Sequence, residues 1–335
     1  SIFYTSINIP YGSMASAVSP ESKDRAELST WRTIGSTLAN MVIGVATPMV
    51  AYVVVDGKTV MSGSRMTIIA GVFSICAILC YIVCFKLTRE RVEVPASSQK
   101  VSASAIFKSI FTNRALLGII VAAIFVLLSQ LTVMSLAGYV YPNVYGSAAA
   151  QSTASLLGTV IMLIVCAPFA SKLAAKFGKK ELAVASSICS ALVWLVCLIW
   201  RPASVWGFVA CYILANIGMG FFNTIIWAMI TDVIDDAEVR SGIREDGTIY
   251  SVYSFARKLG QAFSSGLVGA LLGIIGYTEA TAFDPAVTRG IFNMACIAPI
   301  IGFVCIVLAL VFLYPLNKKK VEENVAALAA RRNSK

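Results

Sequence analysis

Residues 247–276 read GTIYSVYSFARKLGQAFSSGLVGALLGIIG, which has the length and composition of a membrane-spanning helix. Lys258 falls near the middle of this stretch, where a lysine costs roughly 3 kcal/mol unless it faces a wet cavity or a partner. Polar residues recur around it at helical spacing and form one stripe: Ser251, Ser254, Lys258, Gln261 and Ser265. The stretch therefore predicts a helix with one face for lipid or packing and one face along a substrate or ion pathway.

The composition is that of a polytopic membrane protein. The 335 residues are 58% hydrophobic and 13% charged, with a mean hydropathy of +0.80, whereas a soluble domain carries about 25% charged residues. The net charge of +10 lies in short loops between apolar segments, so it indicates topology rather than nucleic-acid binding. The absence of histidine excludes histidine catalysis and histidine metal ligands.

All nine cysteines lie inside apolar segments. Cys76, Cys80 and Cys84 share one helical face, which fits either a soft-metal site or small buried hydrophobic residues. Because cysteine packs as a small hydrophobic side chain, the second interpretation is preferred, and no metal site or cofactor is predicted.

Nine spans are predicted, each long enough to cross about 30 Å of hydrocarbon, at residues 1–18, 20–54, 66–86, 114–141, 150–175, 181–200, 204–232, 247–276 and 289–315. Lys318, Lys319 and Lys320 place the C-terminus in the cytoplasm. With that orientation, most of the 27 lysines and arginines fall in cytoplasmic loops, and the outer loops hold only Lys58, Arg65, Arg201 and Arg289. The predicted location is the plasma (inner) membrane.

The longest polar connection, residues 87–113, divides the chain. Residues 1–86 are predicted to be the last three helices of an N-terminal bundle, 114–316 a six-helix C-terminal bundle, and 317–335 a cytoplasmic tail. Six spans after a long cytoplasmic loop are typical of the second half of a transporter with two six-helix halves. The odd count of nine leads to the expectation that three of twelve helices precede Ser1.

Several spans carry polar residues that suit a hydroxylated ligand. Tyr4 and Asn8 share a face in the first span, close to Pro10, which frees a backbone carbonyl. Arg32 lies inside the second span. The alternatives are interhelical hydrogen bonding by Asn8 and an arginine that snorkels to phosphate.

In the seventh span, Asn223 and Trp227 share one face. The indole plane of Trp227 is suited to stacking on the apolar face of a pyranose, and core packing is the alternative. The helix of Lys258 also carries a small-residue face that predicts a close helix-packing seam, and its residues are Gly266, Gly269, Gly273 and Gly276.

The segment 232–247 is dense in charge: Asp232, Asp235, Arg244 and Glu245 lie within it. No metal-ligand pattern is present in their spacing. Ion pairs that close a cytoplasmic gate are the preferred interpretation, and a solvated loop is the alternative.

Five motifs together resemble one transporter family. They are Asn-Ile-Pro-Tyr-Gly-Ser (8–13), Trp31-Arg32, Asp-Val-Ile-Asp (232–235), Gly-Ile-Arg-Glu-Asp-Gly (242–247) and Tyr-Ser-Val-Tyr-Ser-Phe-Ala-Arg-Lys-Leu-Gly-Gln (250–261). This set is similar to the glycoside–pentoside–hexuronide:cation symporters, the melibiose-permease branch of the major facilitator superfamily. The resemblance covers the whole chain from the family's fourth helix onwards, and it is strongest with the xyloside and glucuronide transporters.

The resemblance implies an all-α polytopic protein that couples uptake of a glycoside, pentoside or hexuronide to H⁺ or Na⁺ by alternating access. The implied solute-binding residues are Tyr4, Asn8, Arg32, Asn223, Trp227, Ser254 and Lys258. Lys258 and Asn8 are the implied coupling residues, and Asp232, Asp235, Arg244 and Glu245 form the implied gate. The chain departs from melibiose permease at Asn8, where that protein has aspartate, and at Gly12, where it has tryptophan.

Two other functions stay open at this point: a carrier of a lipid or a sulfonated sugar, and a transport-incompetent sensor with the same fold. A sensor is expected to lose intramembrane charges, whereas Arg32 and Lys258 are both present. An enzyme is not predicted, because no nucleophile–base pair or phosphate-binding glycine loop occurs. The expected partners are a sugar, a monovalent cation and the bilayer, with no nucleic acid, and the protein is expected to be monomeric.

Overall fold

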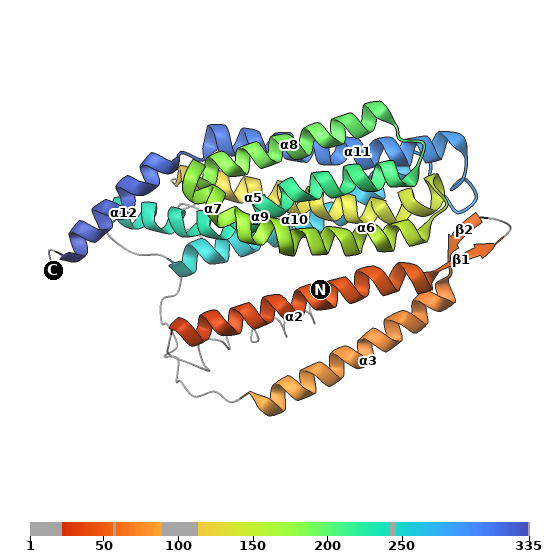
Figure 1. Ribbon diagram of the computed structural model, residues 1–335, viewed down its shortest axis with the longest axis horizontal. Coiled ribbons are helices and arrows are strands. Elements are labelled where there is room, and N and C mark those ends of the chain that lie inside the picture. Colours follow the sequence, from red (N-terminus) through yellow and green to blue (C-terminus); the bar gives the residue numbers. More distant parts are fainter. Residues whose placement is uncertain (1–21, 56–57, 89–112, 242–245, 334–335) are drawn as a thin grey trace. The chain divides into compact units, whose positions relative to one another are not determined.

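The computed structural model describes residues 22–55, 58–88, 113–241 and 246–333 (Figure 1). The chain divides into two compact units. The first comprises Ser1–Val55 with Val60–Lys100, and the second comprises Asp56–Thr59 with Val101–Lys335.

The first unit contains two long helices, α2 (Ser22–Ala51) and α3 (Gly63–Leu87), which pack against each other. Helix α3 is strongly apolar, yet none of its residues is buried, and Phe85 is 85% exposed. A helix that is apolar on every side is suited to a membrane rather than to water.

A short hairpin follows α2: β1 (Tyr52–Val55) pairs with β2 (Lys58–Met61). The predicted span 20–54 is therefore wrong at its end, because the helix ends at Ala51. The sequence carries the reason: β-branched valines flank an Asp-Gly dipeptide at positions 56 and 57, which is a strong hairpin signal. Apart from these two strands, the described elements are helical, so the all-α class is confirmed.

The second unit is a helix bundle, and the order of its elements along the chain is α5 (Arg114–Tyr139), η1 (Val140–Val144), α6 (Ala148–Ile161), η2 (Met162–Cys166), α7 (Ala167–Phe177), α8 (Lys179–Trp200), α9 (Val205–Ser241), α10 (Asp246–Ile274), α11 (Pro285–Leu308), η3 (Ala309–Leu313) and α12 (Lys318–Asn333). Helix α5 packs against α10 and α11, and α8 packs against α9 and α11 (Figure 1). Phe208, Phe222 and Phe303 are fully buried in the core that these helices share.

Six of the described helices are long and apolar enough to cross a membrane: Gly63–Leu87, Arg114–Val144, Ala149–Cys166, Lys179–Trp200, Val205–Ser241 and Pro285–Leu313. Each overlaps a predicted span. The first predicted span lies outside the described residues, and α2 contributes a shorter apolar helix, Gly35–Ala51. Helix α10 has the predicted length but a lower hydropathy, because Arg257, Lys258 and Gln261 interrupt it.

The close approach between α10 and α5 occurs at Gly260. A Cβ atom added there would lie 2.8 Å from the carbonyl oxygen of Ile124. The predicted seam residues Gly266, Gly269 and Gly273 would meet nothing within 4 Å. The packing of α10 against α5 therefore depends on Gly260, which is buried on the side of α10 opposite to the exposed polar stripe.

Gly260→Val is expected to lower the melting temperature of the purified protein in detergent. A branched side chain cannot fit beside a backbone carbonyl, and overpacking costs about 1–3 kcal/mol. Gly269→Val is the matched control, because the same helix gains the same residue in open space. Equal melting temperatures for the two variants would contradict the inferred packing.

Candidate functional site

An aromatic and cationic cluster joins α9 to α10. The Trp227 ring of α9 lies against the Tyr253 ring of α10, with centroids 5.4 Å apart and an interplanar angle of 73°. The Arg257 guanidinium lies 5.4 Å from the centroid of the Trp227 ring and 5.8 Å from that of Tyr253. Arg257 Nη1 also donates a hydrogen bond to the Tyr253 hydroxyl, at 3.3 Å.

The two rings of the cluster differ in exposure. Tyr253 is fully buried, whereas Trp227 is 48% exposed. Trp227 is therefore not fully packed into the core of this unit, and its stacking role stays a prediction. Sequence reasoning missed Tyr253 and Arg257, although the i, i+4 spacing of these two residues on one helix was a usable signal.

The polar stripe of α10 is present as a face of the second unit. Ser254 and Lys258 are both exposed. Lys258 Nζ donates to Gln261 Oε1 one turn further along, at 3.2 Å. Because consecutive stripe residues are three or four positions apart, they present hydroxyl, amide and ammonium groups along one line.

Asn223 connects this region to a third helix. Its Nδ2 donates to Gln130 Oε1 of α5, at 3.4 Å. Asn223 lies four residues before Trp227 on α9, so the amide and the indole share a side of that helix. The structure therefore groups Asn223, Trp227, Ser254 and Lys258 in one unit and adds Gln130 to them.

Four predicted site residues, Tyr4, Asn8, Arg244 and Glu245, lie outside the described residues. Arg32 belongs to α2 in the first unit. Their predicted roles stay predictions.

Asp232 makes an ion pair inside the bundle. Its Oδ1 lies 2.6 Å from Nζ of Lys179, the first residue of α8, and its side chain is only 6% exposed. The same ammonium donates to the carbonyl oxygen of Ala228, at 3.4 Å. This pair joins α8 and α9 within one unit, and the gate role of Asp232 stays a prediction.

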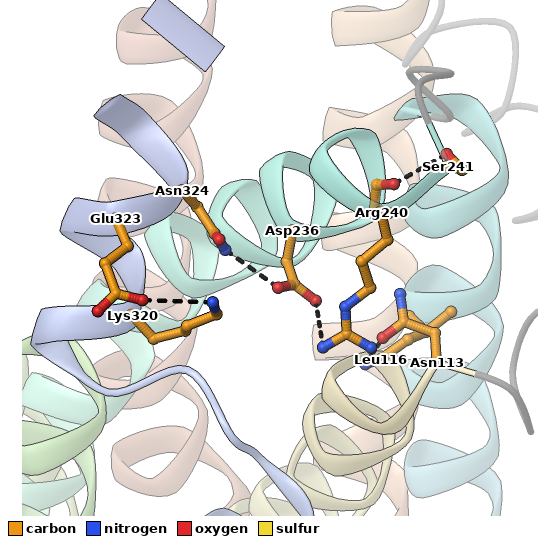
Figure 2. A network of polar contacts seen from close by, with 9 residues as sticks. Asn113, Leu116, Asp236, Arg240, Ser241, Lys320, Glu323 and Asn324 are labelled. Carbon is orange, nitrogen blue, oxygen red and sulfur yellow. Dashed lines mark hydrogen bonds and ion pairs between the residues drawn. The ribbon is translucent and has the colours of Figure 1, made fainter. Parts of the chain in front are cut away.

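A second acidic site lies one turn further along α9, at Asp236, which is 1% exposed. Figure 2 shows Asn324 of α12 and Arg240 of α9 directed at its carboxylate. Asn324 Nδ2 donates to Oδ1 at 3.0 Å, and Arg240 Nη2 lies 2.9 Å from Oδ2. The sequence-based gate prediction named the adjacent Asp235, which is only partly buried, and missed Asp236. The i, i+4, i+8 spacing of Asp232, Asp236 and Arg240 was the signal that these three side chains share one side of the helix.

Helix α12 also caps the end of α9. Arg331 donates to the carbonyl oxygens of Glu238 and Val239, at 3.3 and 3.0 Å. Cationic side chains that bind the last carbonyls of a helix satisfy acceptors that have no partner within that helix. The predicted tail therefore folds as a helix that is fastened to α9.

Asn324→Ala is expected to release α12 from α9. The substitution leaves the buried Asp236 carboxylate without its amide donor, which costs about 1–3 kcal/mol. Faster hydrogen exchange over residues 318–333 of the purified protein is the expected readout. Val325→Ala is the matched control because Val325 is 54% exposed; equal exchange in both variants would count against the docking role of Asn324.

Among the described residues, no group of three or more cysteine, aspartate or glutamate side chains is placed to hold a metal ion. Cys76 and Cys80 are exposed on α3, so they are not the small buried residues that the sequence suggested. Their apolar helix offers them to lipid or to another helix instead.

The sequence matches the family described as MFS/sugar transport protein over residues 1–318. The chain belongs to this family. Its membership accounts for the apolar spans of both units and makes the protein a multi-pass membrane protein of the major facilitator superfamily.

Similar MFS/sugar transport proteins include named carriers. The uncharacterized symporter YjmB of Bacillus subtilis (strain 168) is 31% identical, over 95% of this chain and 68% of its own length. The glucuronide carrier protein homolog of Escherichia coli (strain K12) is 27% identical, over 98% and 71%. The putative sulfoquinovose importer of Salmonella typhimurium is 28% identical, over 99% and 69%. These names are those of transporters, which confirms that the chain is not an enzyme.

Proposed function

We propose that this protein is a secondary active transporter that carries a glycoside, pentoside or hexuronide together with H⁺ or Na⁺ across the plasma membrane by alternating access. The single observation that carries the proposal is the exposed face of α9 and α10. On this face a half-exposed Trp227, the Ser254 hydroxyl and the Lys258 ammonium lie on the surface of an otherwise apolar bundle.

These groups match the chemistry of a sugar. An indole ring covers the apolar face of a pyranose, while hydroxyl, amide and ammonium groups exchange hydrogen bonds with its hydroxyls. A lipid tail offers no partner for those polar groups, so the face favours a hydroxylated solute. The relatives named for glucuronide and sulfoquinovose support an oxygen-rich solute as well.

The remaining site residues complete the proposal. Tyr4, Asn8 and Arg32 are assigned to the solute site from the N-terminal side, with Asn8 and Lys258 taking part in cation coupling. Asp232, Asp235, Arg244 and Glu245 are assigned to the cytoplasmic gate. The C-terminus is placed in the cytoplasm by the lysines at 318–320.

The test uses the complete reading frame, expressed in cells that lack sugar permeases. External pH is followed in a weakly buffered, de-energised suspension while xylosides, glucuronides and galactosides are added in turn, with and without sodium. Alkalinisation on addition of one class identifies proton symport and the solute together. Uptake that rises with sodium, without proton movement, identifies sodium symport. No response to any sugar would overturn the proposed function.

A further inference from the structure

Among the residues that the structure describes, two aromatic rings rather than an acid hold Arg257 in place. Both rings lie within 6 Å of its guanidinium, which is the range of a favourable cation–π interaction. A guanidinium carries five N–H donors, and in the part of the chain that the structure describes its hydrogen bond goes to the Tyr253 hydroxyl. The group is therefore fixed in orientation while most of its donors are left for another acceptor.

The surrounding sequence supplies no anion at this depth. Residues 115–180, 182–231 and 247–278 contain neither aspartate nor glutamate. The buried acids of the described bundle, Asp232 and Asp236, already pair with Lys179 and Arg240 at the end of α9. In the described helices of this unit, the Arg257 guanidinium consequently has no acidic side chain at its own depth.

Position along the helix makes this charge costly. By the rise of a helix, Arg257 lies about 17 Å from Asp246 and about 26 Å from Ile274, well inside α10. A cation at such a depth faces a cavity or a partner rather than lipid. An acid group on the transported solute neutralises it during binding, and the planar fork of arginine matches a pair of carboxylate or sulfonate oxygens.

We propose that Arg257 is the anion-recognising residue of the solute site, and that the solute is a sugar bearing a carboxylate or a sulfonate. This inference rests on the proposed transport function. Trp227 serves twice in this arrangement: one part of its ring holds the guanidinium, and its exposed part covers the sugar ring next to the acid group. The site then prefers acidic sugars over neutral ones, because a bound neutral sugar leaves the Arg257 guanidinium without an anion.

The test compares matched sugars on the full-length protein in detergent. Binding is measured by calorimetry for a glucoside, the glucuronide with the same aglycone and the corresponding 6-sulfonated glucoside. The wild-type protein is expected to bind one acidic sugar at least about tenfold more tightly than the neutral sugar. Arg257→Gln is expected to lower the affinity for the acidic sugar by about 10- to 100-fold, which corresponds to the loss of a charged hydrogen-bonded contact. The affinity for the neutral sugar is expected to fall by less than about threefold.

Arg257→Lys keeps the charge without the fork, and an intermediate affinity for the acidic sugar is expected. Arg289→Gln removes an exposed positive charge from α11 and serves as the control. Comparison of the glucuronide with the 6-sulfonated glucoside shows whether the Arg257 guanidinium prefers a carboxylate or a sulfonate. All variants are first checked for an unchanged elution profile and melting temperature.

Two results would overturn the inference and leave the transport function in place. One is wild-type protein that prefers the neutral sugar. The other is an Arg257→Gln variant that loses affinity for both sugars equally, which means that Arg257 only joins α9 to α10. If neither the neutral nor the acidic sugars bind to wild-type protein, the proposed function fails together with the inference.

Discussion

Lys258→Ala is expected to abolish cation-driven accumulation of the solute, and Lys258→Arg is expected to retain little of it. Lys258 lies about 18 Å from Asp246 along α10, on the exposed polar stripe. Its ammonium is a compact charge whose energy depends on any cation nearby, so it can link solute binding to cation binding. Alanine leaves the rest of the stripe in place but removes that charge. Arginine spreads the charge over a larger planar group.

Uptake of radiolabelled solute into energised cells provides the measurement, with solute exchange in de-energised vesicles alongside. Loss of accumulation with exchange retained identifies a coupling residue, whereas loss of both identifies a residue needed for binding itself. Lys319→Ala, an exposed lysine of α12, is the control for removal of one positive charge. Accumulation by Lys258→Ala at the parent's level would falsify the coupling role.

Lys179→Met is expected to destabilise the second unit by about 3 kcal/mol, near the low end of the cost of breaking a buried pair. The Asp232 side chain is 6% exposed, so without Lys179 its carboxylate stays buried with no cation beside it. We expect a loss of stability near the low end of that range because the Lys179 side chain is 32% exposed, so the pair is only partly buried. The measurement is a thermal melt of the full-length protein in detergent.

A double variant separates the charge from the packing. Lys179→Met combined with Asp232→Leu replaces both charges by apolar groups, which is often neutral for stability. The double variant is therefore expected to melt close to the parent. Lys172→Met tests the removal of an exposed lysine at the same end of the bundle. If the single and double variants melt at the same temperature, the ion pair contributes nothing.

The helix that carries the candidate site could be predicted closely from its residues. The apolar stretch 247–276 and helix α10, Asp246–Ile274, agree within two residues at each end. The spacing of polar residues and the apolar composition are enough to locate such a helix. In a bilayer, every backbone N–H and C=O group of a helix has to be hydrogen-bonded within its own segment. The same reasoning placed the stripe of Ser254 and Lys258 on one face.

The partners of charged side chains could not be predicted in this way. Asp232 pairs with Lys179, and Asp236 pairs with Asn324, which lies 88 positions away in the sequence. Neither contact follows from spacing along one helix. The hairpin of β1 and β2 was missed for another reason. Strand β1 is short and continues the apolar run of α2, so hydropathy alone extended the predicted span over most of it, and β2 fell in the connection between two predicted spans.

The amino-acid sequence by itself determined that this protein is helical, lies in a membrane and carries Arg257 and Lys258 at depth, because length, hydropathy and period are local properties. Only the tertiary structure decided that Trp227 of α9 lies against Arg257 of α10, and that Asp232 is already neutralised by Lys179. Those contacts join different helices, and close approaches such as that of Gly260 to Ile124 set which faces meet. That packing determines which charged side chains can bind a ligand, because a cation and an anion that pair with each other inside the bundle no longer take part in ligand binding.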